Sequence, residues 1–503
     1  MKQNINRPNI IVLLADDLGY GDVSCYNPQG RINTVNIDRC ADEGLMFTNA
    51  HATSALCTPS RYSLLTGRYN WRSRLKQGAF HNYDDNLIED DRITVAEMLK
   101  GAGYKTSCIG KWHLGMKWEK MLPNTEGIGE VDQIPDFTTS FRYGPVDFGF
   151  DHFFGIWGSL NQGPHVFLED DHVCRIPDTI YGDYDSFGYG QGDTLKYGCL
   201  RAPADSSYDP RQCCDIIQKK VLDTIDEYCE GDDPFFIYYP TPAVHIPIIP
   251  TEKFAGKSGI GAYGDFVLQL DSYVKEIMDK LKEKGIEEDT IFIFTSDNGC
   301  APHVNIPDLI RQGHNPSYIY RGRKGDIYEG GHRVPYIVRY PRLVKPGKSD
   351  QMISLADLYR TLADLLGQPV PDCAAEDSVS NLPLWKGEDI AVREDVCSSS
   401  ILGNLCIQEG DWKLETCPAS GGDEWIGHFD ELEKMEPKFQ LYNMRSNVTE
   451  TCNLYELEPE IADRLLRKLA KYIKDGRSTP GAPQKNTGND PNFWRQISWI
   501  KDL

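Results

Sequence analysis

Four short apolar runs constrain the fold of this chain more than any other feature. Stretches with helical features separate them, including one opened by Thr94 and Glu97 in the pattern of a capping box and the amphipathic segment Phe266–Lys284. Strands that are apolar at every position are buried on both faces, which is typical of a largely parallel sheet covered by helices. We therefore predict an α/β fold, a large mixed sheet flanked by helices, with strands at Ile10–Leu14, Thr106–Ile109, Phe235–Tyr239 and Ile291–Thr295.

The pattern changes beyond a helix predicted over Leu355–Leu366. This helix closes the first domain, to which we assign residues 1–370. Residues 371–503 are expected to hold a smaller antiparallel sheet, an amphipathic helix from about Pro459 to Lys474 and a polar tail that wraps the surface. Two stretches without periodicity, 121–143 and 181–208, are predicted to be long loops near the functional site. The strands of the smaller sheet are expected at Asp395–Ser399, Asn404–Gln408, Trp412–Glu415 and Phe439–Tyr442.

Composition limits the partners of the chain. The formal net charge of −22 argues against binding to nucleic acid or to an anionic membrane, and mildly against a long polyanionic substrate. No apolar run is long enough to span a bilayer. The polar N-terminus runs into the first strand without a signal peptide, so we expect a cytoplasmic protein, or a periplasmic or secreted one if a leader has been removed. The 15 cysteines, without any Cys-x-x-Cys pair, are expected to be mostly reduced, buried thiols.

Polar side chains follow each of the four predicted strands. They are Asp16, Asp17, Lys111, His113, His245, Asp297 and Asn298. The carboxyl ends of parallel strands share one edge of the sheet, where α/β proteins bind ligands, so these side chains should lie together. The four oxygen donors among them suit Ca²⁺ or Mg²⁺ and not zinc. Taken separately, Asp16-Asp17-Leu18-Gly19 and Asp297-Asn298-Gly299 are also ordinary turn sequences.

One cysteine stands in an unusual context. Cys57-Thr58-Pro59-Ser60-Arg61 is followed by Leu65-Thr66-Gly67-Arg68. Pro59 suits the first turn of a helix and Gly67 suits its end, which places Cys57 at a helix N-terminus, where free N–H groups favour an anion. Arg61 lies one turn further on and faces the same side. A cysteine before an N-terminal proline would on its own be a structural residue.

This motif resembles the signature of the formylglycine-dependent (type I) sulfatases, in particular the group of arylsulfatase A and N-acetylgalactosamine-6-sulfatase. The resemblance extends from Asp16 to the segment Gln440–Asn443 and implies an alkaline-phosphatase-like fold. It implies that a formylglycine-generating or radical maturation enzyme oxidises Cys57 to formylglycine, whose hydrate attacks sulfur. It also implies one divalent cation, Ca²⁺ rather than Mg²⁺, held by Asp16, Asp17, Cys57, Asp297 and Asn298.

The same resemblance implies roles for the remaining polar residues. Arg61 would hold the hydrate, and Lys111 and Lys324 would neutralise the sulfate oxygens. His245 would protonate the leaving oxygen and His113 would assist release of the sulfate. Considered alone, Lys324 could belong to a run of charged residues exposed to solvent, and His245 could be a structural histidine with its hydrogen bonds satisfied. Candidates for the outer pocket are Ser159, Trp112, His165, His314, Arg321, Arg72 and Arg74.

The implied activity is hydrolysis of a sulfate monoester by residues 1–370. Long polar loops favour a small sulfated saccharide, and hence a role in glycan degradation. One alternative is a phosphatase, phosphodiesterase or phosphonate hydrolase of the same superfold, because sulfate and phosphate esters share a shape. Two zinc ions with several histidine ligands would indicate that alternative. The other is a catalytically inactive homologue that only binds its ligand.

Overall fold

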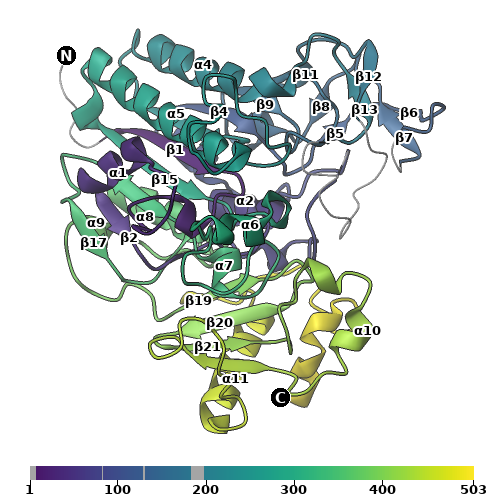
Figure 1. Ribbon diagram of the computed structural model, residues 1–503, viewed down its shortest axis with the longest axis vertical. Helices are drawn as coiled ribbons and strands as arrows, with labels where there is room; N and C mark the ends of the chain where they lie inside the picture. The colour runs from purple at the N-terminus through teal and green to yellow at the C-terminus, as the bar shows by residue number, and fades with distance from the viewer. Residues whose placement is uncertain (1–6, 82, 129–130, 183–197) are drawn as a thin grey trace.

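The computed structural model describes residues 7–81, 83–128, 131–182 and 198–503. Its larger part is a ten-stranded mixed sheet between two layers of helices (Figure 1). In sheet order the strands are β11 (His172–Val173), β10 (Leu168–Glu169), β9 (His152–Ile156), β4 (Lys105–Lys111), β14 (Phe235–Pro240), β1 (Asn9–Ala15), β15 (Thr290–Ser296), β16 (Tyr336–Arg339), β2 (Leu45–Phe47) and β17 (Gly347–Ser349). The four predicted strands are confirmed as β1, β4, β14 and β15, which run parallel at the centre of the sheet.

Strand β1 shows why these strands are apolar at every position. Alternate side chains of a strand point to opposite faces. Ile10 and Val12 pack in the core formed with α2 (Cys57–Thr66), α3 (Val95–Gly101) and α8 (Leu358–Leu366). On the other face, Ile11 and Leu13 pack in the core formed with α1 (Val35–Asp42), α4 (Pro210–Tyr228) and α5 (Ala262–Lys284). Helices cover both faces, so neither set of side chains meets water.

The predicted capping box of α3 is present. The Thr94 hydroxyl accepts a hydrogen bond from the backbone N–H of Glu97 at 3.1 Å, and the Glu97 carboxylate accepts one from the N–H of Thr94 at 2.7 Å. Two N–H groups that the helix itself leaves without partners are thereby satisfied. The cap fixes where the chain turns into α3 before it enters β4.

The smaller elements connect the strands or border the sheet. Residues 121–143 hold three short strands in two-stranded pairs at one edge of the molecule (Figure 1). None of the described residues of this stretch, 121–128 and 131–143, lines the site pocket described below, so the prediction that they form a loop beside the site is wrong. Of the stretch 181–208, residues 183–197 lie outside the described residues. The smaller elements of the larger part are η1 (Tyr20–Asp22), β3 (Ala50–His51), η2 (Asn70–Arg72), β5 (Lys117–Trp118), β6 (Met121–Pro123), β7 (Gln133–Pro135), β8 (Phe141–Arg142), η3 (Pro145–Phe148), β12 (Thr179–Tyr181), β13 (Ala202–Ala204), η5 (Glu287–Asp289), η6 (Pro302–Val304), α6 (Ile306–Arg311), α7 (Glu329–His332), β18 (Ile353–Ser354), η7 (Leu355–Asp357) and α9 (Leu382–Trp385).

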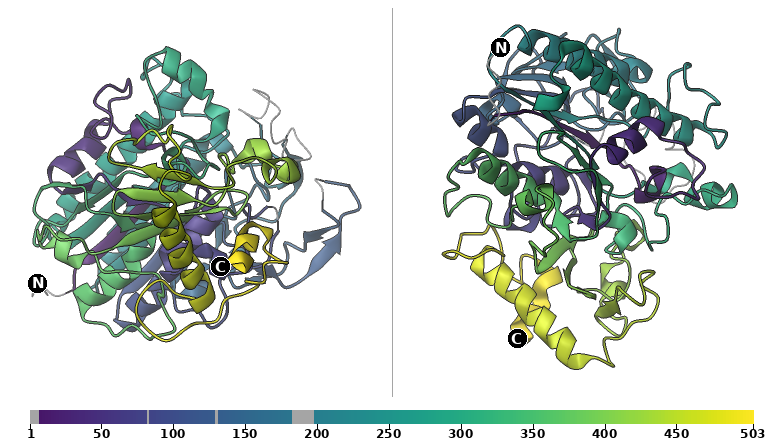
Figure 2. Two further views of the ribbon diagram at one scale, coloured as in Figure 1. Left: turned by 90° about the horizontal axis from the view of Figure 1, so that it is seen from below. Right: turned by 90° about the vertical axis from the view of Figure 1, so that its left-hand side faces the viewer.

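A second sheet follows the larger part in sequence. Its strands β19 (Asp395–Ser399), β20 (Leu405–Glu409), β21 (Trp412–Glu415) and β22 (Gln440–Asn443) pair in antiparallel order, as predicted. Helix α11 (Pro459–Asp475) packs its apolar face on this sheet (Figure 2). The short helices η8 (Asp423–Trp425), α10 (Phe429–Leu432) and η9 (Arg495–Asp502) complete this part.

Apolar and ionic contacts join the two parts. Tyr69 and Trp71, which follow α2, are buried in the hydrophobic cluster of the small sheet. The ammonium group of Lys413 in β21 is fully buried and lies 3.1 Å from Glu329 of α7 and 2.6 Å from Glu450. A buried charge is tolerated when it is paired in this way. The small sheet is therefore packed tightly against the larger part.

All 15 cysteines lie in the described residues and none of them forms a disulfide; ten are buried, as the composition predicted. Among the described residues, no helix combines the length and the apolar character needed to cross a membrane.

Candidate active site

The carboxyl ends of the four central strands bring the predicted polar residues together. Asp16 and Asp17 follow β1, and Asp297 follows β15, its neighbour in the sheet. His245 follows β14, on the other side of β1, and one of its ring nitrogens lies within 4.8 Å of carboxylate oxygens of Asp16 and Asp17. Asp17 adopts a φ of 62°, a left-handed conformation that non-glycine residues rarely take. Such strain concentrates at functional sites, which agrees with the position of Asp17.

Cys57 opens helix α2 beside these carboxylates. The helix ends at Gly67, whose φ of 65° is the left-handed conformation that a helix C-cap favours. The Cys57 sulfur lies within 4.8 Å of carboxylate oxygens of Asp16 and Asp297. Burial raises the pKa of the thiol, although Lys111 and Lys324 favour the thiolate. In a formylglycine form of residue 57, the aldehyde oxygen would take the place of this sulfur.

The oxygen donors form a site that fits a hard cation. The backbone N–H of Asp17 donates to Asp297 Oδ1 at 3.2 Å, and Asn298 Nδ2 donates to Asp17 Oδ1 at 2.8 Å. Asn298 Oδ1 is buried and receives no hydrogen bond from any described residue. Buried polar atoms are normally satisfied, so an orphaned amide oxygen beside three carboxylates indicates a missing ligand. Carboxylate and amide oxygens are the donors that Ca²⁺ and Mg²⁺ prefer.

Three cationic side chains face the carboxylates. Arg61 Nη2 lies 2.6 Å from Asp297 and 3.3 Å from Asp16. Lys111 Nζ lies 2.8 Å from Asp16. Lys324 Nζ lies 2.6 Å from Asp17. Three positive and three negative side chains cancel, so a bound divalent cation would make the site positive and attractive to an anionic ester.

The pKa values of Asp16 and Asp297 are shifted in opposite directions. Burial opposes ionisation of Asp16, but Lys111, His245, Arg61 and Lys324 outweigh it and lower its pKa. For Asp297, burial dominates over the nearby Arg61 guanidinium and raises the pKa to about 7. A bound cation would favour the ionised form of this carboxyl group as well.

Two histidines border the same site. His245 Nδ1 pairs with the Ile246 carbonyl at 2.8 Å, and Nε2 lies 3.4 Å from Asp17. His113 Nε2 pairs with the Phe80 carbonyl at 2.9 Å, and its backbone φ is 56°. Burial lowers the pKa of His245 to about 4 and that of His113 well below its usual value. Both rings are therefore neutral here, and a bound anion would favour their protonation.

A pocket of about 80 Å³, which we call the site pocket, is lined by four of these residues: Cys57, His113, His245 and Lys324. Pockets that hold a whole drug-sized ligand measure roughly 300–1,000 Å³, so the site pocket has room for an ester group and not for a whole saccharide. Ser159 lies on its wall, with its hydroxyl 2.6 Å from Lys111 Nζ. Wall residues that the sequence analysis missed are His81, Gln162, Ile246, His303, Ile401 and Asp423.

The missed residues carry little local signal. His81 and His303 are single histidines in irregular segments, and the other four stand in no recognisable motif. Ile401 and Asp423 come from the small sheet and its loops, more than 300 residues after Cys57 in sequence. Only the packing of the two parts brings them to the pocket, and local patterns do not specify that packing.

Five predicted pocket residues lie elsewhere, and the sequence analysis is corrected on this point. Each is held by a structural partner. Trp112 donates to the Gly115 carbonyl, His165 pairs with the Leu200 carbonyl, His314 pairs with Asp22, Arg72 pairs with Asp377 and Arg321 donates to the Glu450 carbonyl. Buried polar side chains need such partners, which a sequence does not reveal. Arg74 lines a neighbouring cleft, which is considered below.

Comparison with known proteins agrees with the resemblance noted in the sequence. The sulfatase family profile matches residues 8–368. An N-acetylgalactosamine-6-O-sulfatase of Bacteroides thetaiotaomicron is 36% identical over 94% of each chain. Arylsulfatase A of Homo sapiens is 31% identical over 96% of this chain and 91% of its own length. A solved structure from a study of glycosaminoglycan metabolism by B. thetaiotaomicron superposes with a TM-score of 0.79 at 35% identity, covering 92% of this chain and 98% of that chain.

Proposed function

Because the chain belongs to the sulfatase family, we propose that this hydrolase removes sulfate from a saccharide, with residue 57 as the nucleophile after conversion to formylglycine. The fold is the alkaline-phosphatase-like fold of that family. One observation carries the proposal. Cys57 opens a helix within 4.8 Å of the carboxylates of Asp16 and Asp297, beside two buried lysines that can receive sulfate oxygens. The relative that acts on N-acetylgalactosamine 6-sulfate supports a sugar as the alcohol part of the ester.

We infer that a maturation enzyme, of the formylglycine-generating or the radical type, prepares residue 57. Cys57, Pro59 and Arg61 stand in the pattern of the sulfatase signature. The hydrated aldehyde supplies an oxygen nucleophile and a second hydroxyl group whose deprotonation expels sulfate without attack by a separate water. A plain alcohol at this position lacks the second hydroxyl.

We propose Ca²⁺ as the cation of this site, held by Asp16, Asp17, Asp297 and Asn298 together with residue 57. Ca²⁺ accepts several protein oxygens in an irregular arrangement, whereas Mg²⁺ usually keeps several waters in a strict octahedron. A bound divalent cation supplies Lewis acidity, which lowers the pKa of a coordinated hydroxyl group and neutralises a sulfate oxygen.

The basic side chains of the site bind and orient the ester. Lys111 is paired with Asp16 and Lys324 with Asp17. Each ammonium group can also donate a hydrogen bond to a sulfate oxygen. Their charges stabilise the negative charge that spreads over these oxygens as the S–O bond breaks. Ser159 fixes the Lys111 ammonium group through its 2.6 Å hydrogen bond. Arg61 bridges Asp297 and Asp16 and keeps both carboxylates in place.

His245 and His113 move protons. The pairing of His245 Nδ1 with the Ile246 carbonyl fixes the ring, so that Nε2 faces Asp17 and the pocket. Protonated His245 gives its proton to the leaving sugar oxygen. His113 also lines the pocket, and its Nδ1 makes no hydrogen bond with a described residue. We propose that this nitrogen accepts the proton of the second hydroxyl group at residue 57.

Replacing His245 with alanine is expected to separate two kinds of substrate. A sugar alcohol is a poor leaving group and needs protonation, so sulfate release from a sugar sulfate should fall by roughly 10²-fold or more. An activated aryl sulfate such as 4-nitrocatechol sulfate needs little protonation and should lose less than about tenfold. His428→Ala, at an exposed histidine away from the pocket, serves as the control. Equal losses on both substrates would show that His245 is not the general acid.

A substrate panel tests the proposed function itself. Protein produced together with a maturation enzyme is offered sulfated mono- and disaccharides, and free sulfate is measured. We expect release from at least one sugar sulfate and no release by the Cys57→Ala variant. Turnover of aryl sulfates without release from any saccharide would refute the assignment to sugars, and release of phosphate from phosphate esters alone would refute the sulfatase assignment.

A further inference from the structure

A second cavity lies beside the site pocket, where the two parts meet. This cavity, which we call the junction cleft, has a volume of about 700 Å³. Parts of four segments line it: residues 74–78, 401–402, 426–429 and 493–496. Its volume lies within the range of about 300–1,000 Å³ of pockets that hold small organic ligands. A sugar fits the junction cleft, whereas the site pocket holds only an ester group.

The cleft and the pocket are adjacent and share part of their lining. Ile401 lines both of them, and Gly78 of the cleft directly precedes Ala79 of the pocket. Backbone hydrogen bonds join their walls: Ile401 N–H donates to the Gly325 carbonyl at 2.9 Å, and Gly78 N–H donates to the Ile401 carbonyl at 2.8 Å. Gly325 directly follows Lys324, which we propose as a sulfate ligand. A substrate that places its ester beside Lys324 therefore has the junction cleft next to it, on the other side of Ile401.

The lining of the cleft favours an anion. It includes Arg74, Lys76 and Arg495, and none of the described residues that line it carries a carboxylate. This local charge contrasts with the net charge of −22 for the whole chain. Arg495 is already paired with Glu433 and Asp430, and Lys76 is buried against Trp71 and Trp494. Arg74 is thus the cation of the cleft that is best placed to meet a ligand.

Arg74 is exposed but held in one orientation. Its guanidinium group lies 4.8 Å from the centre of the Phe80 ring, and Nη2 donates to the Asp85 carbonyl at 2.7 Å. Among the described residues, all its hydrogen bonds leave from Nη2. The other guanidinium nitrogens can therefore donate to a carboxylate or sulfate, and the fixed orientation reduces the entropy lost on binding.

The C-terminal segment of the cleft lining offers an aromatic surface. Phe493 is 65% exposed, although it belongs to the lining of a cavity. An exposed apolar side chain inside a cavity, beside cations and amides, is a feature of ligand sites more than of bare surface. The Gln496 side chain spans the cleft wall and donates to Gln77 Oε1 at 3.2 Å. An apolar ring face and amide groups together suit a sugar ring, which has both C–H and hydroxyl groups.

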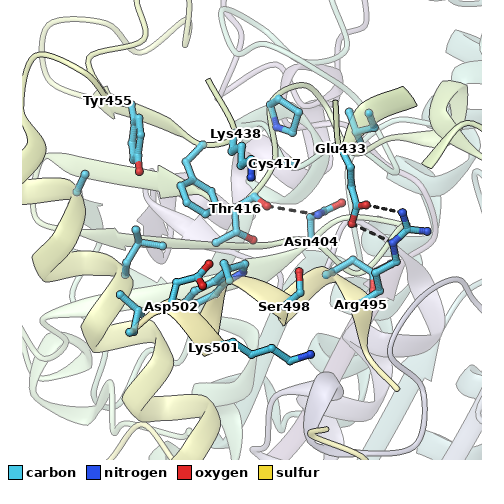
Figure 3. A pocket seen from close by; sticks show the side chains of 18 of the residues that line it. Asn404, Thr416, Cys417, Glu433, Lys438, Tyr455, Arg495, Ser498, Lys501 and Asp502 are labelled. Atoms are coloured by element: carbon cyan, nitrogen blue, oxygen red, sulfur yellow. Dashed lines mark hydrogen bonds and ion pairs between the residues drawn. The ribbon is translucent and has the colours of Figure 1, made fainter. Parts of the chain in front are cut away.

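A larger cavity on the small sheet does not share this character. It has a volume of about 880 Å³ and is shown in Figure 3. Four acidic and three basic side chains line it, and the Arg495 guanidinium is held by Glu433, as the dashed lines in Figure 3 show. This cavity therefore lacks the excess of positive charge found in the junction cleft, which is the better site for an anionic saccharide.

We propose that the junction cleft binds the neighbouring sugar of the substrate, that this sugar carries a carboxylate or a second sulfate, and that Arg74 receives this group while Phe493 packs on the ring. The proposal rests on the proposed sulfatase function and names its substrate class. The substrate is then an oligosaccharide of at least two units, with the scissile ester on the unit in the site pocket.

Three substrates with the same sulfated sugar test this proposal: the monosaccharide, a disaccharide with a neutral neighbour and a disaccharide with a uronate neighbour. A fourth, with a sulfated neighbour, distinguishes the two anionic groups. We expect kcat/KM of the wild-type protein to be about tenfold higher for an anionic neighbour than for the neutral one, the size expected of a charge-assisted hydrogen bond in an open cleft. Equal kcat/KM for the anionic and the neutral neighbour would overturn the proposal.

Variants of Arg74 and Phe493 test which side chain causes the preference for an anionic neighbouring sugar. Arg74→Gln should remove the preference for the anionic neighbour and change monosaccharide turnover by less than about twofold, while Arg74→Lys should keep part of the preference. Phe493→Ala should lower kcat/KM for every disaccharide by several-fold and leave the monosaccharide unaffected. Controls are Arg39→Gln on α1 and Leu457→Ala, which is 73% exposed outside the cleft. An Arg74→Gln variant that keeps the full preference would also overturn the assignment.

The outcomes separate this inference from the function on which it rests. If the wild-type protein hydrolyses the monosaccharide without any response to the neighbour, the sulfatase function stands and the cleft proposal fails. Binding of the desulfated uronate disaccharide, measured by ligand-detected NMR, provides a readout that does not depend on turnover. Loss of that binding in Arg74→Gln, with an unchanged melting temperature, is the expected result.

Discussion

Replacing Cys57 with alanine is expected to abolish sulfate release, by a factor of at least about 10⁴, because the nucleophile is lost while the cation site remains. Mass spectrometry of the peptide that contains residue 57 should show formylglycine in active wild-type protein. Protein made in a host without a maturation enzyme should contain plain cysteine and be inactive. The buried thiol cannot replace the aldehyde, because burial raises its pKa and keeps it protonated. Active protein that contains only unmodified cysteine would contradict the proposed mechanism.

The Cys57→Ser variant gives a sharper result than alanine. Serine provides one hydroxyl group at the right place, but it has no second hydroxyl whose deprotonation expels sulfate. Made in a host without a maturation enzyme, this variant should accept sulfate and keep it, so that protein mass spectrometry detects a sulfated serine and no turnover follows. Sustained turnover by the serine variant would show that the second hydroxyl is dispensable.

Removal of the divalent cation is the second change with a large expected effect. Chelation should lower sulfate release by about 10³-fold or more, because the site then loses its Lewis acid and the net positive charge that attracts the anionic ester. Added Ca²⁺ should restore activity and raise the melting temperature as its concentration increases. A ligand at 100 times its Kd stabilises a folded protein by about 2.7 kcal/mol. Elemental analysis should find one calcium per chain, and two zinc ions would instead favour a phosphatase.

Asn298 offers a variant of the cation site that leaves the charges intact. Its orphaned Oδ1 belongs to the one uncharged side chain among the four that are assigned to the cation beside residue 57. Asn298→Ala should weaken Ca²⁺ binding by about 10- to 100-fold, a loss typical for disturbed metal sites, as measured by calorimetry. Asn305→Ala, in an irregular turn between η6 and α6, is the matched control. Unchanged Ca²⁺ affinity in Asn298→Ala would remove this residue from the site.

The sequence was sufficient where local chemistry determines structure. Strands β1, β4, β14 and β15 were predictable because burial on both faces leaves a continuous apolar run. The start of α2 at Cys57 followed from Pro59 and Gly67. The polar residues that end the strands could be placed together because parallel strands share their carboxyl edge.

The sequence was insufficient where distant segments meet. The order β14–β1–β15 depends on how whole strands pack, and no single run encodes it. His314 was expected to lie in the pocket, but it is buried against Asp22, 292 residues away in sequence. Ile401 and Asp423 reach the site only because the small sheet docks on the larger part. The sequence shows the chemical type of a polar residue near a motif, but it does not show which distant residue will bind that side chain in the fold.

The wall between the site pocket and the junction cleft is built from main chain, which has a practical consequence for redesign. The hydrogen bonds from the Ile401 N–H to the Gly325 carbonyl and from the Gly78 N–H to the Ile401 carbonyl involve only main-chain groups. These hydrogen bonds do not involve the side chain of residue 401, so that side chain can be replaced without changing the path of the backbone. A library at 401, 74 and 493 would therefore sample new substrate preferences on an unchanged catalytic centre.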